Sequence, residues 1–381
     1  MVSMRWLLAL MLWLLPWLQM VKSGYIRQQF RYFRTSDTWD SMTIPKDGVY
    51  LVSLIASPGY HMGRGFSLQI FVYCDSFRPY FSKKILLAGL AEGLITHAEV
   101  AASLKKGDKL FLWIKGKAKD GSSFSVVYVA EPNSFYVTVK SDRVAKDSVI
   151  KFAAQLTPNG WTELKGEKMT TFSVTITGMY WVTARVNPWK TNVRMFVVQG
   201  SRNLIVAYGK GVKPISCSGA FHIEAGSTIE AVVVDRQYYE SRTLLSFVYL
   251  AGNKKPNTYP FEHLAFTARY GVTRYSAAKE VLKFNRVETD YGYMYRDGYT
   301  EIRRSGTYMV SIRPYPDSTA IVTVTFYVNG KSFWVVKVEK GIPSGATVAI
   351  SLRVGSYVYI QSDKGTRLTD NTLFSIAFIQ P

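Results

Sequence analysis

The chain has 381 residues, which corresponds to about three domains of ordinary size. Hydrophobic residues make up 48% of it and charged residues 19%, which excludes a disordered or low-complexity chain. Two cysteines cannot form a disulfide scaffold, and 47 Lys and Arg against 27 Asp and Glu give a net charge of +20. We therefore expect several folded domains with an affinity for anions.

The N-terminus predicts secretion. A short basic start, Met1–Arg5, precedes the apolar run Trp6–Leu18, which at 13 residues is shorter than the ~20 residues that a membrane-spanning helix needs. The small residues Val21 and Ser23 then suit a cleavage site after Ser23. We predict a signal peptide over residues 1–23 and an extracellular protein without a transmembrane anchor.

Three signatures recur in a fixed order and predict a domain repeated three times. The first is Gly-x-Tyr within alternating apolar residues, and its glycines lie 130 and 128 residues apart. The second is a glycine turn that opens a strand, and the third is a closing strand with a central serine. The three signatures are marked by Gly48, Gly178 and Gly306, by Gly107, Gly226 and Gly355, and by Ser125, Ser246 and Ser375.

The periodicity within each copy is that of β-strands. Val322–Val328 and Lys331–Val336 alternate on either side of Asn329-Gly330, a pair that favours the positive φ angles of a type I′ hairpin turn. No convincing capped helical pattern occurs. Many short strands with glycine turns predict an all-β protein of three tandem domains, each a β-sandwich or jelly roll.

At these residues the chain resembles a known family. Ala265–Arg269, Val281–Asn285 and the later signatures of the third copy resemble the complement C1q globular head over its whole length. The second copy has a similar opening at Phe152–Leu156. The resemblance implies the ten-stranded jelly roll that this family shares with the tumour necrosis factor superfamily, and assembly as trimers.

The first copy departs from the family pattern. Only 24 residues separate Gly24 from Gly48, against 40 between Phe266 and Gly306, so we expect it to lack one or two strands at its start. The predicted domains are residues 24–134 (truncated), 148–252 and 261–381.

The family resemblance also suggests how the copies are arranged. Family heads associate from three chains, whereas here three heads lie in one chain without a collagen stalk. The linker 252–260 spans at most about 30 Å when extended. We predict an intramolecular pseudo-trimer, with separate beads on a string as the alternative.

Catalysis and metal binding find little support in the sequence. None of the four histidines, His61, His97, His222 and His263, stands in a metal-ligand or catalytic motif. We predict no enzyme activity and no cofactor. Some family heads hold calcium, but the nearest candidates, Asp363 and Asp370, do not form a dense acidic loop.

Two kinds of site residue can be named. Cys74 and Cys217 could pair with each other, link two chains or remain as buried thiols. The best contact loops combine arginine with tyrosine, which suits sugar rings and acidic groups. They hold Arg236, Tyr238, Tyr239 and Arg242 in the second copy, and Tyr60 and Arg64 in the first.

Taken together, the sequence predicts a secreted multivalent protein that recognises anionic or carbohydrate surfaces, as lectin-like proteins of innate immunity do. The expected partners are anionic glycans, microbial surfaces or acidic matrix proteins, and not nucleic acid. One alternative is a structural protein of an extracellular or shell matrix. Another is a hormone-like ligand of a receptor.

Overall fold

A computed structural model describes most of the chain in separate segments. In these segments the regular elements are β-strands, and no helix there is long and apolar enough to cross a bilayer. The predicted signal peptide and its cleavage site after Ser23 lie outside them. The described residues are 25–29, 40–56, 69–75, 83–88, 96–115, 123–130, 136–140, 150, 154–155, 161–163, 171–186, 193–210, 213–234, 243–252, 264–271, 274–292, 295–317, 322–338, 345–363 and 366–380.

The third unit is a complete two-layer jelly roll. Its inner sheet has the order β21 (Arg286–Tyr291), β19 (Ala265–Arg269), β30 (Leu373–Gln380), β24 (Gly306–Arg313), β27 (Ala346–Leu352). Its outer sheet has the order β22 (Tyr295–Arg296), β23 (Tyr299–Glu301), β28 (Tyr357–Ser362), β25 (Val322–Val328), β26 (Lys331–Val338). A short pair, β20 (Arg274–Ser276) and β29 (Thr366–Leu368), lies beside them. Alternating apolar residues of both sheets fill the layer between them.

The first unit repeats this plan, with fewer strands among the described residues. Its inner sheet is β1 (Tyr25–Gln29), β8 (Ser123–Ala130), β3 (Gly48–Ala56), β6 (Thr96–Leu104). Its outer sheet is β2 (Asp40–Thr43), β7 (Lys109–Lys115), β4 (Gln69–Asp75), β5 (Lys83–Ala88). Among the described residues, β21 and β22 have no counterpart here. The opening strand itself is present as β1, because Arg27 pairs with Ser125 as Thr267 of β19 pairs with Ser375.

In the second unit the two layers are joined. The strand order is β10 (Ala154–Gln155), β9 (Tyr136–Lys140), β18 (Leu244–Gly252), β13 (Gly178–Val186), β16 (Lys213–Ile223), β15 (Arg202–Lys210), β14 (Val193–Gln199), β17 (Thr228–Val233), β12 (Thr171–Val174), β11 (Trp161–Glu163). The long strand β16 pairs with β13 of the inner layer and, at Pro214, with Gly209 of the outer layer.

The opening strand of the second unit differs from the one that the sequence suggested. Thr138 of β9 lies opposite Ser246, as Thr267 lies opposite Ser375 in the third unit. Strand β9 therefore takes the place of β19, although it lies ahead of residue 148. The stretch 152–156 contributes only Ala154–Gln155 as a short outer neighbour of β9. The alternation of Val137 and Val139 around Thr138 is the pattern that the inner sheet requires.

The Gly-x-Tyr signature has one structural role in all three units. Each tyrosine hydroxyl donates a hydrogen bond to the carbonyl oxygen four residues earlier, which closes the loop before the strand. Each ring also meets an aromatic ring of the closing strand edge-on, with 5.4 Å between ring centroids. The three hydrogen bonds join Tyr50 to Lys46, Tyr180 to Ile176 and Tyr308 to Arg304.

The predicted hairpin is confirmed in the third unit. Asn329 and Gly330 have φ angles of 50° and 78°, which are the positive angles that a type I′ turn needs at both central positions. Strands β25 and β26 pair on either side of them.

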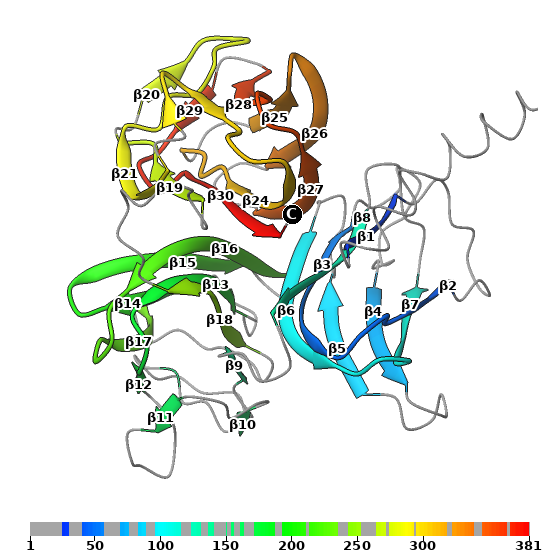
Figure 1. The fold of residues 1–381 in the computed structure, drawn as a ribbon. Coiled ribbons are helices and arrows are strands. Elements are labelled where there is room, and N and C mark those ends of the chain that lie inside the picture. Colours follow the sequence, from blue (N-terminus) through cyan, green and yellow to red (C-terminus); the bar gives the residue numbers. More distant parts are fainter. Residues whose placement is uncertain are drawn as a thin grey trace, which may run out of the picture.

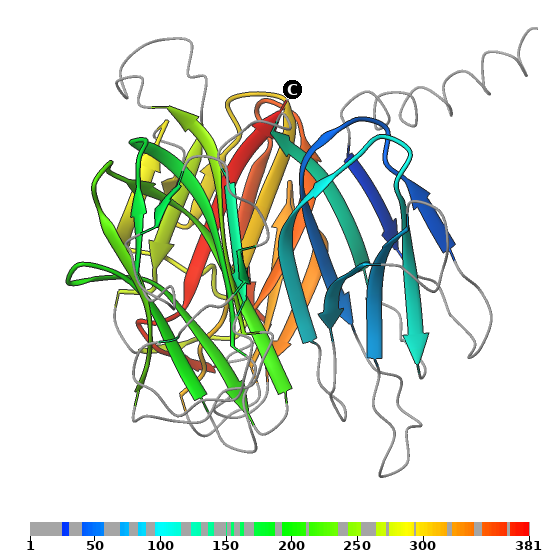
Figure 2. The ribbon, with the colours of Figure 1, turned by 90° about the horizontal axis from the view of Figure 1, so that it is seen from below.

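The three inner sheets face one another and bury a shared apolar cluster (Figures 1 and 2). Leu51, Trp181 and Met309 each lie three residues after the glycine of a Gly-x-Tyr signature, and all three belong to this cluster. Because equivalent residues meet there, the three units stand around one central line with their Gly-x-Tyr ends on the same side. The strands paired with these residues add Ala101, Ala220, Ala349, Val127, Val248 and Ala377.

Candidate binding surface

Two residues further along the same strands, the shared cluster becomes polar. Glu99 of β6 is fully buried and accepts three hydrogen bonds from the second unit. The donors are Trp181 Nε1 at 2.6 Å, Thr183 Oγ1 at 2.9 Å and Ser218 Oγ at 3.1 Å. Burial raises the pKa of Glu99, while these donors oppose the rise. Glu99 therefore joins the first unit to the second through buried hydrogen bonds, and a further hydrogen bond with the Thr347 side chain connects it to the third unit.

His97 lies next to Glu99 and is equally buried. Its Nε2 atom lies 3.7 Å from Glu99 Oε2 and 3.3 Å from Ser53 Oγ. Burial lowers the pKa of His97 to about 3, and the nearby Arg185 guanidinium adds to this effect. The imidazole is therefore neutral at physiological pH. Ser53 in turn donates a hydrogen bond to the Thr347 carbonyl at 2.9 Å, which links the first unit to the third.

In the first unit His97 pairs with Ile55. The residues at the position equivalent to His97 are Ser216 in the second unit and Gly345 in the third. At this level the second and third units approach closely, because a Cβ atom on Gly345 would lie 2.6 Å from the Ser216 carbonyl oxygen. Such a distance essentially never occurs in folded proteins, so the approach requires glycine here. Ile55 itself packs into the core of the third unit.

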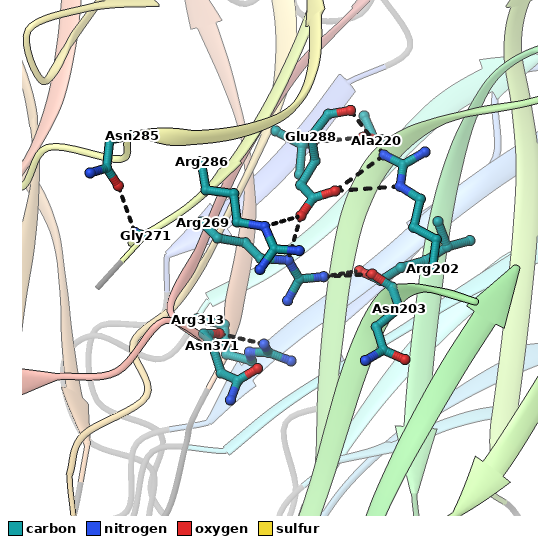
Figure 3. A network of polar contacts seen from close by, with 12 residues as sticks. Arg202, Asn203, Ala220, Arg269, Gly271, Asn285, Arg286, Glu288, Arg313 and Asn371 are labelled. Carbon is teal, nitrogen blue, oxygen red and sulfur yellow. Dashed lines mark hydrogen bonds and ion pairs between the residues drawn. The ribbon is translucent and has the colours of Figure 1, made fainter. Parts of the chain in front are cut away.

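An arginine network joins the second and third units (Figure 3). Glu288 of β21 accepts from Arg269 Nε at 2.9 Å and lies 3.3 Å from Arg202 Nη2 and 3.4 Å from Arg286 Nε. Arg269 also donates to the carbonyls of Asn203 and Leu204 at 2.8 and 2.9 Å. The buried guanidinium is thus neutralised by one carboxylate and held by two backbone oxygens of the neighbouring unit.

Cys217 is a free, buried thiol. Its Sγ atom lies 3.4 Å from Nη1 of Arg313, which crosses from the third unit and also donates to the Val206 carbonyl. Burial raises the pKa of this thiol. The side chain of Cys74, the other cysteine named from the sequence, lies outside the described residues.

The outer sheet of the third unit carries an exposed row of tyrosines. Tyr299, Tyr359 and Tyr327 lie side by side on β23, β28 and β25. The rings of Tyr327 and Tyr359 are stacked, with centroids 5.0 Å apart and 4° between planes, and Tyr299 is 5.1 Å from Tyr359. Tyr299 is 40% exposed and the other two are half-buried. We call these three residues the tyrosine ladder.

The ladder is fixed by the sheet beneath it. Phe326 and Ile360, which alternate with ladder residues, are buried in the core of the third unit, so the ladder strands are anchored from below. The three phenols also shield one another, and burial together with these neighbours raises the pKa of Tyr359. A row of rings on paired strands keeps its spacing without any ligand, which reduces the entropy cost of binding.

The second unit has no such row. At the equivalent register it places Thr171, Glu230 and Val198, and the Thr171 hydroxyl contacts Glu230 at 3.5 Å. The ladder was missed in the sequence, because Tyr299, Tyr327 and Tyr359 belong to three strands that lie apart along the chain. Only the strand register could have found it.

The contact residues proposed from sequence are not placed by the structure. Arg236, Tyr238, Tyr239, Arg242, Tyr60 and Arg64 all lie outside the described residues. Asp363, the nearest calcium candidate, accepts a hydrogen bond from Thr325 Oγ1, which lies 2.8 and 2.9 Å from its two carboxylate oxygens, and so links β25 to the end of β28. Within the described segments no three acidic, histidine or cysteine side chains gather as metal ligands.

No protein-family model and no curated protein matches the chain. Among solved structures it is similar to pika GITRL, at 13% identity and TM-score 0.24, over 30% of this chain and 96% of that one. It is also similar to the CBM22-1-CBM22-2 tandem domain of Paenibacillus barcinonensis Xyn10C, at 12% identity and TM-score 0.18, over 64% and 92%. A protein of an archaeal virus described as a triple jelly roll has 10% identity and TM-score 0.20, over 94% and 88%. The likeness is one of jelly-roll fold, and scores this low indicate nothing about ligands.

Proposed function

We propose that this chain is a secreted, non-catalytic binding protein of the C1q-like type that recognises carbohydrate surfaces. The observation that carries the proposal is the tyrosine ladder. Tyrosine rings held in a row on a sheet offer aromatic surface against which the C–H groups of sugar rings can pack, and phenol hydroxyls that can hydrogen-bond to sugar hydroxyls. Tyr299, Tyr327 and Tyr359 form such a row, in which Tyr327 and Tyr359 stack face to face.

The buried polar contacts between the units have a structural role in this function. Glu99 and His97 are buried among protein donors and acceptors, and Glu288 is covered by three guanidiniums. These groups join units rather than face solvent. They support a single-chain counterpart of a trimer, in which the outer sheets of all three units are presented on one body.

The ladder proposal is tested by binding to polysaccharides. We expect the wild-type chain to be retained on at least one neutral polysaccharide from a panel of insoluble cellulose, chitin, β-1,3-glucan and mannan. Tyr359→Ala should weaken this binding roughly tenfold, because Tyr359 contacts both other rings of the ladder. Tyr359→Phe keeps the ring and should bind nearly as well.

A matched control is Glu230→Ala, which changes the position equivalent to Tyr359 in the second unit and should leave binding unaltered. Equal binding by Tyr359→Ala and wild type, with unchanged melting temperature, would contradict the role of the ladder. Absence of binding to every neutral polysaccharide would contradict carbohydrate recognition by this surface.

The single-chain assembly is tested by small-angle scattering of the purified mature chain. A monomeric mass with one compact particle is the expected result. An elongated three-lobed particle would contradict it and favour independent units.

A matrix protein is the second candidate function. The high positive charge of the chain supports it, because basic modules can cross-link acidic polymers. Recovery of the protein mainly from insoluble or mineralised matrix would favour this role over surface recognition.

A further inference from the structure

Two turns at one end of each unit are joined into a rigid pair. One precedes the Gly-x-Tyr strand and the other is the glycine turn after β6, β16 or β27. In the first unit, Ile44 N–H bonds the Asp108 carbonyl and Gly107 N–H bonds the Ile44 carbonyl, at 2.8 and 2.9 Å. A side chain of the first turn then accepts from the backbone of the second in every unit. Asp47 accepts from the N–H of Lys106 at 2.6 Å, Thr177 from the N–H of Ala225 at 2.8 Å, and Ser305 from the N–H of Val354 at 3.0 Å.

In the first and third units this pair of turns carries clustered cations. Lys46 and Arg304 occupy equivalent positions, and each lies over an aromatic ring of the closing strand. Lys46 Nζ is 3.3 Å from the centroid of Tyr128, and Arg304 Cζ is 4.6 Å from that of Phe378. These contacts with the aromatic rings hold the Lys46 ammonium and the Arg304 guanidinium in position. The remaining cations of the pair of turns are Lys105 and Lys106 in the first unit, and Arg303 and Arg353 in the third.

Both acidic side chains in the first unit's pair of turns accept hydrogen bonds from the backbone. Asp108 Oδ2 accepts the Lys105 N–H at 2.8 Å, and Asp47 Oδ1 accepts the Lys106 N–H at 2.6 Å. Their carboxylates therefore point back at the backbone of the turn, while Lys105 and Lys106 are exposed. The six cations of the two units lie on the same side of the molecule, since the Gly-x-Tyr ends of all units do.

The second unit has the same turns without the charge. The equivalents of Lys46 and Lys105 there are Ile176, which is 42% exposed, and Glu224. The positive charge at this end is therefore a property of two particular units and not of the repeated fold. Positive charge that served only solubility could be spread over the whole surface and would not need to be grouped at the turns of two units.

We propose that the turn ends of the first and third units together bind a sulphated polysaccharide. Two separate groups of three cations suit a linear polymer with repeated anionic groups, which can contact both, better than a small anion, which needs one convergent pocket. Arginine adds paired hydrogen bonds to sulphate oxygens. This inference rests on the proposed extracellular recognition function but uses a different surface from the tyrosine ladder.

The test uses heparin as the probe and the full mature chain. Lys46→Gln/Lys105→Gln/Lys106→Gln and Arg303→Gln/Arg304→Gln/Arg353→Gln should each lower heparin affinity roughly tenfold at physiological salt. The control with the same charge change is Arg194→Gln/Lys279→Gln/Lys283→Gln, which alters exposed cations away from these turns. The control should keep at least half of the wild-type affinity.

Equal losses in all three variants would overturn the proposal in favour of non-specific charge. Binding to vesicles of phosphatidylserine but not to heparin would overturn it in favour of a lipid surface. If Lys46→Gln loosens the loop before β3, Lys105→Gln/Lys106→Gln tests the same turn without touching the Tyr128 contact. Neutral-polysaccharide binding by these variants should be unchanged, which separates a failure here from a failure of the ladder.

Discussion

The junction between the first and second units and the junction between the second and third units bury their acids in opposite ways. Glu99 is surrounded by neutral donors from Trp181, Thr183 and Ser218, so burial dominates and its pKa rises. Glu288 instead meets three guanidiniums. The repeated fold thus supplies equivalent strands, while the side chains at equivalent positions of these strands differ from unit to unit. Such differences between equivalent positions give specificity, because a wrong pairing would leave buried polar groups without partners.

The largest effect is expected at the charged junction. Glu288→Ala leaves the buried Arg269 guanidinium without its carboxylate, which should cost about 3–5 kcal/mol in the free energy of unfolding. Thermal or urea unfolding measures it. Asp317→Ala, which removes the partner of the exposed Arg367 at 3.1 Å, should cost no more than about 1 kcal/mol. Equal costs for the two variants would show that the junction pair is not special.

The second largest effect is expected where the second and third units approach each other closely. Gly345→Ala places a Cβ atom against the Ser216 carbonyl oxygen, at 2.6 Å before any shift. We expect a loss of about 1–3 kcal/mol from overpacking and a larger particle in small-angle scattering. Ser351→Ala, at an exposed site on the strand that follows Gly345, is the control. A fully stable Gly345→Ala would mean that the units do not approach as described.

The neutral junction should be sensitive to pH. Glu99→Leu leaves Trp181 Nε1 without an acceptor and should cost about 1–3 kcal/mol, whereas Glu99→Gln keeps an acceptor and should cost less. Because folding raises the pKa of Glu99, its contribution to stability is complete below the unfolded-state pKa of about 4.5 and is lost as pH rises through the folded-state pKa.

The stability of Glu99→Gln relative to wild type should therefore improve as the pH rises from 4 to 8. His97, whose lowered pKa acts in the opposite direction, is present in both proteins. A constant difference across this range would show that Glu99 does not change its protonation on folding.

The smallest effects are expected where the three units are alike. Tyr50→Phe, Tyr180→Phe and Tyr308→Phe each remove one hydrogen bond to a loop carbonyl and should each cost about 0.5–1.5 kcal/mol. Similar values would support one shared role for the Gly-x-Tyr signature. A value near zero in a single unit would mark the loop of that unit as held by other contacts.

Much of the fold could be predicted because it depends on local patterns. Alternation with period two, the turn at Asn329-Gly330 and the recurring Gly-x-Tyr signature identify strands, turns and repeats without any long-range information. The start of the second unit was misplaced for the same reason. Both 136–140 and 152–156 are short segments with strand character, and only pairing with β18 distinguishes them.

By itself the sequence determined an all-β chain of three related jelly rolls, since side-chain alternation and glycine positions act within a few residues. Tertiary structure alone decided which side chains meet. Glu99 lies next to Trp181 and Tyr359 next to Tyr327 because strands distant in the chain align in register or pack across a junction. The candidate surfaces belong to this second category, because a ligand contacts neighbours in space, whatever their separation along the chain.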